Sequence, residues 1–212
     1  EDSPHWCLGG GMLHGVRLEN GKALSYRNRF IGTAAYKGEA SGLAANMGNT
    51  ALLHHHNKLL ALYEVGPPHE CDPFDLSTAG VYDFGGAIKS AVTAHPKVDK
   101  KTGELFMFGY SPVAPFLTYY VVDAKGAVIH KTEIDIPQPT MMHDFQLTET
   151  HAIFMDLPIV MDLTLLSTGF PFRWAPEAGA RIGVMPRKGT GADMTWFEVD
   201  LCYMFHTFNA YN

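Results

Sequence analysis

Features that would indicate several other classes of protein are scarce in this chain. Only 18% of its 212 residues are charged, the formal net charge is −6, and no Lys- or Arg-rich run is present. A protein that binds nucleic acid through its phosphates usually has a basic face, so we expect no nucleic acid partner. The three cysteines, Cys7, Cys71 and Cys202, are widely spaced and odd in number, which indicates reduced thiols. No apolar run approaches the roughly 20 residues of a membrane span, and no signal segment opens the chain.

Apolar residues are plentiful enough for a large core. They make up 46% of the sequence, which excludes disorder caused by excess charge. No convincing domain boundary is visible, so residues 1–212 are expected to be part of a single domain. Because Glu1 begins the sequence, a compact motif starts at His5-Trp6, and the chain stops three residues after Asn209, we expect a fragment truncated at both ends.

Short apolar runs separated by turn residues predict one β-hairpin after another. In residues 12–30 the Asn20-Gly21 pair can supply the positive φ angles of a tight hairpin turn. Asn57-Lys58 is the expected turn of a second hairpin. Similar units are expected at residues 100–110, 117–134 and 151–163, the last as a pair of strands at 151–157 and 159–163. Only short helical turns are expected, and the Gly- and Pro-rich stretches 65–73 and 170–191 are interpreted as loops.

Three histidines, His95, His143 and His206, lie beside or within apolar runs, 48 and 63 residues apart. Each interval is about the length of a four-stranded sheet. This spacing favours a β-propeller over a sandwich, because the innermost strand of every propeller blade faces a common axis. One histidine from each blade would then reach the same point, and neutral imidazole is the commonest metal ligand. The sequence therefore predicts an axial metal site.

The residues around these histidines resemble the iron-histidine motifs of the carotenoid cleavage oxygenases. The motifs are Thr-Ala-His-Pro-Lys-Val-Asp at 93–99, Met-Met-His-Asp-Phe at 141–145, and Phe-His with Asn-Ala-Tyr within 205–211. Other similar segments follow the same order and extend the resemblance over nearly the whole chain: 5–14, 26–30, 49–64 and 169–186. One departure is Leu-Gly-Gly-Gly-Met at 8–12, where the family has Asp-Gly-Asp-Gly-Met.

The resemblance implies an all-β, seven-bladed β-propeller, of which this chain covers roughly the first half or more of the blades. It also implies one Fe(II) held by four histidines, three of which are His95, His143 and His206, with the fourth outside this chain. Neutral imidazoles suit iron and leave coordination positions open for dioxygen. By motif position, Glu64 would accept a hydrogen bond from a ligand histidine and fix its orientation.

The implied activity is that of a non-haem Fe(II) dioxygenase. With O2 it would cleave one carbon-carbon double bond of a carotenoid or apocarotenoid to give carbonyl (apocarotenal) products. Lignostilbene-cleaving relatives carry a lysine just before the glutamate, and Tyr63 at that position favours a carotenoid substrate. A lignostilbene-type stilbene dioxygenase, a polyene isomerase, an inactive propeller binding module and a three-histidine zinc hydrolase stay open as alternatives. The chain alone, with three of four ligands, is expected to be inactive.

An apolar stretch at 163–172 resembles family loops that dip into the bilayer at the tunnel mouth. Leu165, Leu166, Phe170 and Phe172 would form such a patch, because few charges accompany them. The alternative is that these residues pack under neighbouring blades. We expect a cytoplasmic protein with this candidate peripheral membrane contact.

The conspicuous cluster His54-His55-His56 is not expected to bind a metal ion. Consecutive residues of a strand point to opposite faces, so these three side chains cannot share one ion. His14, His69, His130 and His151 match no ligand motif and are interpreted as surface or packing residues.

Overall fold

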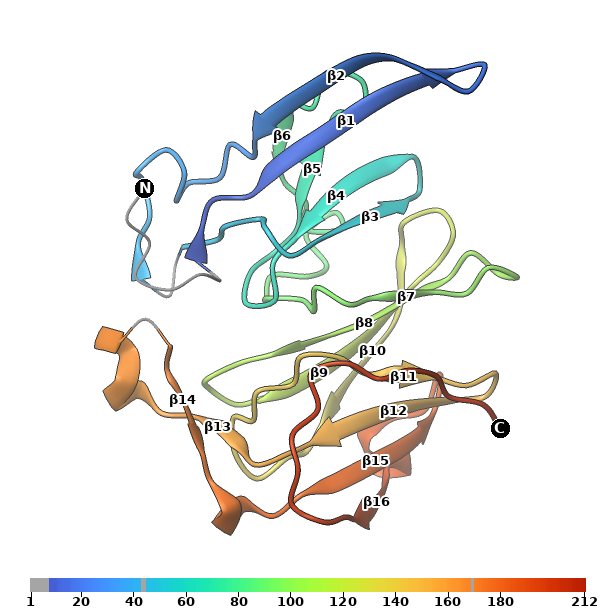
Figure 1. The fold of residues 1–212 in the computed structure, drawn as a ribbon. Coiled ribbons are helices and arrows are strands. Elements are labelled where there is room, and N and C mark those ends of the chain that lie inside the picture. The colour runs from blue at the N-terminus through green and yellow to red at the C-terminus, as the bar shows by residue number, and fades with distance from the viewer. Residues whose placement is uncertain (1–7, 43–44, 169) are drawn as a thin grey trace.

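A computed structural model describes residues 8–42, 45–168 and 170–212 of the chain. The chain begins with a hairpin of β1 (Met12–Glu19) and β2 (Lys22–Phe30), in which Asn20 and Gly21 both have positive φ, as predicted. Three antiparallel four-stranded sheets follow, and they succeed one another from top to bottom in Figure 1. The motif His5-Trp6 and Cys7 lie outside the described residues, and Cys71 and Cys202 are free thiols.

Each sheet begins, along the chain, with a strand at its edge. The first sheet has the order β3 (Ala51–His55), β4 (Lys58–Leu62), β5 (His69–Cys71) and β6 (Thr78–Val81). The second has the order β7 (Lys97–Val98), β8 (Leu105–Tyr110), β9 (Leu117–Val122) and β10 (Val128–Ile134). The third has the order β11 (Gln146–Leu147), β12 (His151–Asp156), β15 (Arg181–Pro186) and β16 (Thr195–Glu198). Between β12 and β15 the chain forms a separate pair, β13 (Ile159–Met161) and β14 (Phe172–Trp174). The short 3-10 helices η3 (Leu163–Thr168), η4 (Pro176–Ala178) and η5 (Gly191–Asp193) lie between strands of this part of the chain.

Three predictions about strands and turns are wrong. Residues 151–157 do not pair with 159–163, because β12 pairs with β11 and β15 while β13 pairs with β14. The stretches 65–73 and 170–191, expected as loops, contain β5, β14 and β15. The turn of the second hairpin is His56-Asn57, so Lys58 already belongs to β4. Pairing of β5 with β4, of β14 with β13 and of β15 with β12 outweighs the local Gly and Pro signals in these segments.

The second sheet is packed on both faces. Along β8, Leu105 and Met107 join a core cluster with Leu60 and Leu62 of the first sheet, whereas the alternate residues Phe106 and Phe108 join a cluster with residues of the third sheet. β9 alternates in the same way. All residues of both strands are buried, which explains why their sequences are almost entirely apolar. Packing on β8 and β9 therefore sets the relative positions of the three sheets.

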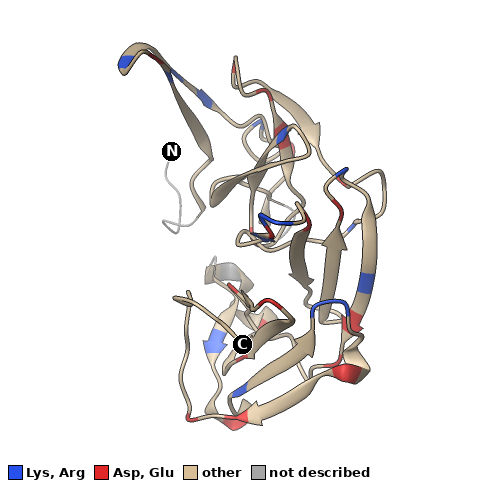
Figure 2. Cartoon of the chain, turned by 90° about the vertical axis from the view of Figure 1, so that its right-hand side faces the viewer, with Lys and Arg blue, Asp and Glu red and all other residues tan. Residues whose placement is uncertain are grey.

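Charged residues of both signs are scattered over the ribbon in the view of Figure 2. Two ion pairs connect the turn after β15 to the second sheet: Arg187 Nη1 lies 2.5 Å from Asp99 Oδ2, and Lys188 Nζ lies 2.6 Å from Glu104 Oε1.

No helix in the described part of the chain has the length and apolar character that crossing a bilayer requires.

Gly109 allows the segment before β7 to lie directly against β8. A Cβ atom at this position would lie 2.1 Å from the carbonyl oxygen of Ala91. Next to this contact, the Thr93 N–H donates to the Phe108 carbonyl oxygen at 2.6 Å. The close approach therefore holds residues 91–95, which end in His95, on the second sheet.

We expect Gly109→Ala to lower the free energy of unfolding by about 1–3 kcal/mol, because the added methyl group fits only if the backbone at Ala91 moves. Gly32→Ala is a matched control, since a Cβ atom there meets Thr78 Cβ at an ordinary 3.6 Å. Urea unfolding of the complete protein that contains this sequence measures both variants. Equal unfolding midpoints for the two variants would contradict the close approach.

Candidate metal centre

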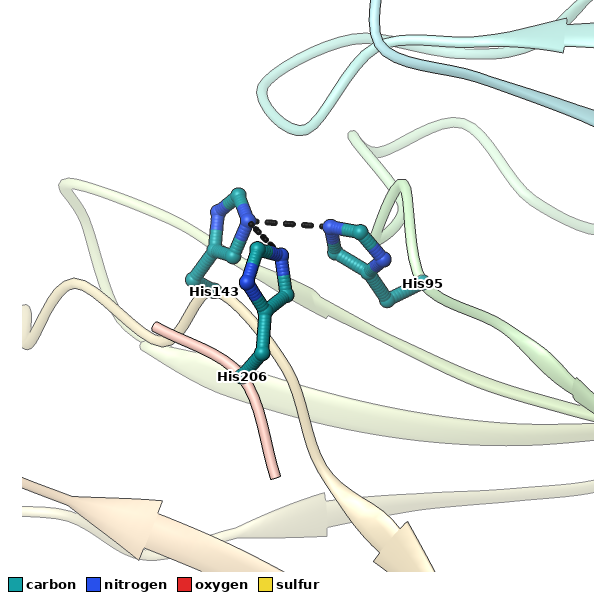
Figure 3. A group of neighbouring side chains, drawn as sticks. All are labelled: His95, His143 and His206. Carbon is teal, nitrogen blue, oxygen red and sulfur yellow. Dashed lines mark hydrogen bonds between the residues drawn. The ribbon is translucent and has the colours of Figure 1, made fainter. Parts of the chain in front are cut away.

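The three predicted histidines come from three separate segments. His95 lies two residues before β7 and His143 three residues before β11, so each precedes the first strand of its sheet. His206 follows β16 in a segment without regular structure. Figure 3 shows the three rings turned toward one another. The histidines thus lie just outside the strands, and the packing of the sheets brings them together.

The Nε2 atoms of the three rings converge on one place. His143 Nε2 lies 2.9 Å from His95 Nε2 and 3.2 Å from His206 Nε2. The ligand atoms offered by these residues all lie within 4.8 Å of one another. Two nitrogen ligands at right angles around a metal ion, with bonds of about 2.1 Å, are about 3.0 Å apart. The spacing of His143 from each of the other two rings therefore fits neighbouring ligands of one metal ion.

Burial favours the neutral form of His95, and a hydrogen bond orients the ring of His143. Burial lowers the pKa of His95 below its usual value, and the neighbouring His143 ring lowers this pKa further. His143 Nδ1 lies 2.5 Å from Glu64 Oε2, and an ionised carboxylate can only accept a hydrogen bond. His143 therefore carries its proton on Nδ1 and presents the Nε2 lone pair to the other rings. Such a set of imidazoles suits zinc, copper, iron or nickel.

Glu64 connects the first sheet to the other two. It lies two residues after β4, and its Oε2 accepts the hydrogen bond from His143, just before the third sheet. Its Oε1 accepts a hydrogen bond of 2.7 Å from the hydroxyl of Tyr110, at the end of β8 in the second sheet. Burial, and then the charge of Glu64, raise the pKa of Tyr110 well above its usual value, so the phenol stays protonated and donates. Sequence reasoning missed Tyr110, which reads as the end of an apolar run.

A buried carboxylate, Asp144, lies beside the histidine segments. Burial alone would raise the pKa of Asp144, but Lys97 Nζ at 2.7 Å holds the pKa below its usual value. The Thr207 hydroxyl also donates to Asp144 Oδ2 at 3.3 Å. Sequence reasoning missed Asp144, Lys97 and Thr207 as functional residues. Their only signal in the sequence is that each lies within two residues of a predicted ligand.

The consecutive histidines do not join this group. His55 Nε2 lies 2.9 Å from the Gly103 carbonyl oxygen, and His56 has a positive φ in the hairpin turn. Among the residues that the structure describes, the group that could hold a metal ion contains His95, His143 and His206 and none of His54, His55 and His56.

The apolar residues expected at the tunnel mouth lie on η3 and just before or within β14. Leu166 and Phe170 are 42% and 37% exposed. Leu165 is half-buried, and Phe172 is half-buried against the core cluster between the second and third sheets. The four side chains therefore divide between the surface and the core.

Comparison with known proteins identifies the family. The family described as retinal pigment epithelial membrane protein matches residues 1–212. A carotenoid 9,10(9',10')-cleavage dioxygenase 1 of Arabidopsis thaliana is 37% identical over 98% of this chain and 46% of its own length. An isoeugenol monooxygenase of Pseudomonas nitroreducens is 38% identical over 88% of this chain and 39% of its own length. The chain thus spans about half the length, or less, of these relatives.

Solved structures show the same fold. A lignostilbene dioxygenase of Pseudomonas brassicacearum matches with a TM-score of 0.80 at 32% identity, over 90% of this chain and 45% of its own. A cobalt-substituted apocarotenoid oxygenase of Synechocystis matches with a TM-score of 0.79 at 23% identity, over 96% of this chain and 50% of its own. The predicted all-β fold class is confirmed. The chain belongs to the retinal pigment epithelial membrane protein family, the family of the carotenoid cleavage oxygenases that its histidine motifs resemble.

Proposed function

We propose that the complete protein containing this chain is a non-haem Fe(II) dioxygenase that cleaves a carbon-carbon double bond of a carotenoid or apocarotenoid into two carbonyl products. One observation carries the proposal. The Nε2 atoms of His95, His143 and His206 converge, with Glu64 hydrogen-bonded to His143, in a chain of this family. The fourth ligand is proposed to come from outside residues 1–212.

Each residue of the site has a separate task in this proposal. Fe(II), when bound, would supply the binding and activation of dioxygen beside the alkene. His95, His143 and His206 would hold the ion through Nε2. Glu64 keeps the His143 proton on Nδ1, and the Tyr110 hydroxyl holds the other Glu64 oxygen, so the carboxylate cannot rotate away from His143. The converging group of described residues contains no carboxylate, so these three ligands would leave the charge of a bound ion unneutralised.

An aromatic alkene is the second candidate substrate. The alignment with the isoeugenol monooxygenase spans 191 positions, fewer than the 212 residues of this chain. The alignment with the Arabidopsis enzyme spans 253 positions, so at least 41 of them (253 − 212) have no counterpart here. Such differences in length between relatives usually fall in loops, and loops often carry the residues that contact the substrate. Tyr63, directly before Glu64, is the residue that favours a carotenoid on sequence grounds.

We also infer that η3 and Phe170 meet a lipid bilayer from the aqueous side. Residues 163–168 carry no charge, and Leu163 and Leu166 are both exposed. An uncharged helical turn with exposed leucines can enter the headgroup region without spanning the membrane. Such a contact would let the protein take up an apolar polyene from the bilayer.

We expect His143→Ala to abolish iron binding, because this ring contacts both other histidines and Glu64. His151→Ala is the matched control, since His151 lies on β12 outside the converging group. Elemental analysis of the complete purified protein should find iron in the wild type and in His151→Ala, and only background in His143→Ala. Unchanged iron in His143→Ala would contradict the ligand assignment, and zinc in place of iron in the wild type would favour a hydrolase.

Product analysis distinguishes the candidate substrates. We expect the complete iron-loaded protein, supplied with O2, to convert an apocarotenal into two carbonyl products with a kcat/KM at least about 10-fold above that for isoeugenol or a hydroxystilbene. Mass spectrometry identifies the products. The reverse preference would favour the aromatic alkene, and no carbonyl product from any of the three would indicate a binding module without activity.

Negative charge introduced on η3 tests the membrane contact. Leu163→Glu with Leu166→Glu should reduce co-sedimentation of the complete protein with phosphatidylcholine vesicles to background, because two carboxylates would have to enter the headgroup region. Val16→Glu with Leu18→Glu, at exposed positions of β1, is the control that should leave sedimentation unchanged. Equal sedimentation of both double variants and the wild type would contradict a contact through η3.

A further inference from the structure

Asp144 joins the segments that carry the three histidines. Its Oδ1 accepts hydrogen bonds from Lys97 Nζ at 2.7 Å and from the Phe145 N–H at 2.8 Å, and its Oδ2 accepts one from the Thr207 hydroxyl at 3.3 Å. Lys97 lies two residues after His95, Asp144 directly follows His143, and Thr207 directly follows His206. One carboxylate therefore connects segments that are 47 and 63 residues apart in the sequence.

The burial of Asp144 makes these partners necessary. Asp144 is only 3% exposed, and a carboxylate removed from water is costly unless an opposite charge and hydrogen-bond donors compensate it. Lys97 supplies the charge, and Thr207 and Phe145 supply further donors. Asp144 is not a member of the converging group of ligand atoms, so it acts on the segments that carry the ligands.

The His206 segment depends most on this contact. The His95 segment is held by the hydrogen bond from Thr93 to Phe108, and the His143 segment by one from the Met141 N–H to the Ile159 carbonyl oxygen at 2.8 Å. Within the described ranges, residues 200–212 contain no strand and make no backbone–backbone hydrogen bond. The Thr207 hydroxyl, which is hydrogen-bonded to Asp144 and to the Gln146 amide, anchors the segment on one side of His206, and Phe205 packs against the His143 ring on the other.

We propose that Asp144 is a positioning residue that holds His95, His143 and His206 in the arrangement in which they share one metal ion. This role rests on the proposed metal site. Without the charge of Asp144, Lys97 loses its partner and Thr207 loses a strong acceptor. His206 moves first, because no backbone–backbone hydrogen bond holds residues 200–212 within the described ranges. Groups that support metal ligands typically change metal affinity by about 10–100-fold, and we expect this range for Asp144→Asn.

Co(II) titration of the metal-free complete protein tests the role. Asp144→Asn should weaken Co(II) binding about 10–100-fold and change the visible absorption spectrum of the bound ion, which reports its coordination geometry. Thr207→Val should shift both readouts in the same direction by less. The matched control is Asp156→Asn. Asp156 is 7% exposed and accepts hydrogen bonds from Arg181 at 2.8 Å and Thr140 at 2.7 Å, and neither partner lies within two residues of the three histidines. The Asp156→Asn variant should have a lower melting temperature and an unchanged Co(II) affinity and spectrum.

Three outcomes would overturn the positioning role. If the wild type binds Co(II) and both Asp144→Asn and Thr207→Val keep its affinity and spectrum, the role is wrong while the metal site stands. If Asp156→Asn weakens Co(II) binding as much as Asp144→Asn, the effect is general loss of stability. If the wild type binds no Co(II), the metal site itself fails. Thr207→Val decides the test where Asp144→Asn does not fold, because Thr207 is half-buried and loses only a hydroxyl group.

Discussion

The burial of both faces of the second sheet is the constraint on which the candidate site depends. Alternate residues of β8 and β9 belong to core clusters on opposite sides, so the first and third sheets cannot slide without exposing aromatic side chains such as Phe106 and Phe154. Exposing one such side chain costs about 1.5–3 kcal/mol. Because His95 and His143 each precede the first strand of a packed sheet, the same contacts that exclude water from the core also bring the two rings together.

Two carboxylates then hold the histidine side chains and their segments in positions that the packing of the sheets sets only approximately. Glu64 sits after the first sheet and binds Tyr110 from the second and His143 before the third, so the orientation of the His143 ring is coupled to all three sheets. Asp144 binds Lys97 and Thr207 and couples the ligand-bearing segments to one another. The Glu64 contact sets the ring orientation and the proton position of His143, and contacts of this kind support metal ligation.

Much of this arrangement is predictable from local sequence, and the rest is not. Asn20-Gly21 identifies its hairpin, since the positive φ angles of the turn are a local property. The motif flanks single out the three histidines that converge. The pairing of β12 with β15 is not predictable, because β13 and β14 intervene and the adjacent apolar run looks like the natural partner. The bonds of Tyr110 to Glu64 and of Thr207 to Asp144 join residues 46 and 63 apart, and only the packed sheets bring these residues into contact.

The central claim is that His95, His143 and His206 hold one iron ion between them. Anomalous X-ray diffraction at the iron absorption edge, from crystals of the complete protein, measures this most directly. We expect a single anomalous peak at bonding distance, about 2.1 Å, from the three Nε2 atoms. A map with no peak between the three rings, or with its iron peak elsewhere in the molecule, would contradict the claim.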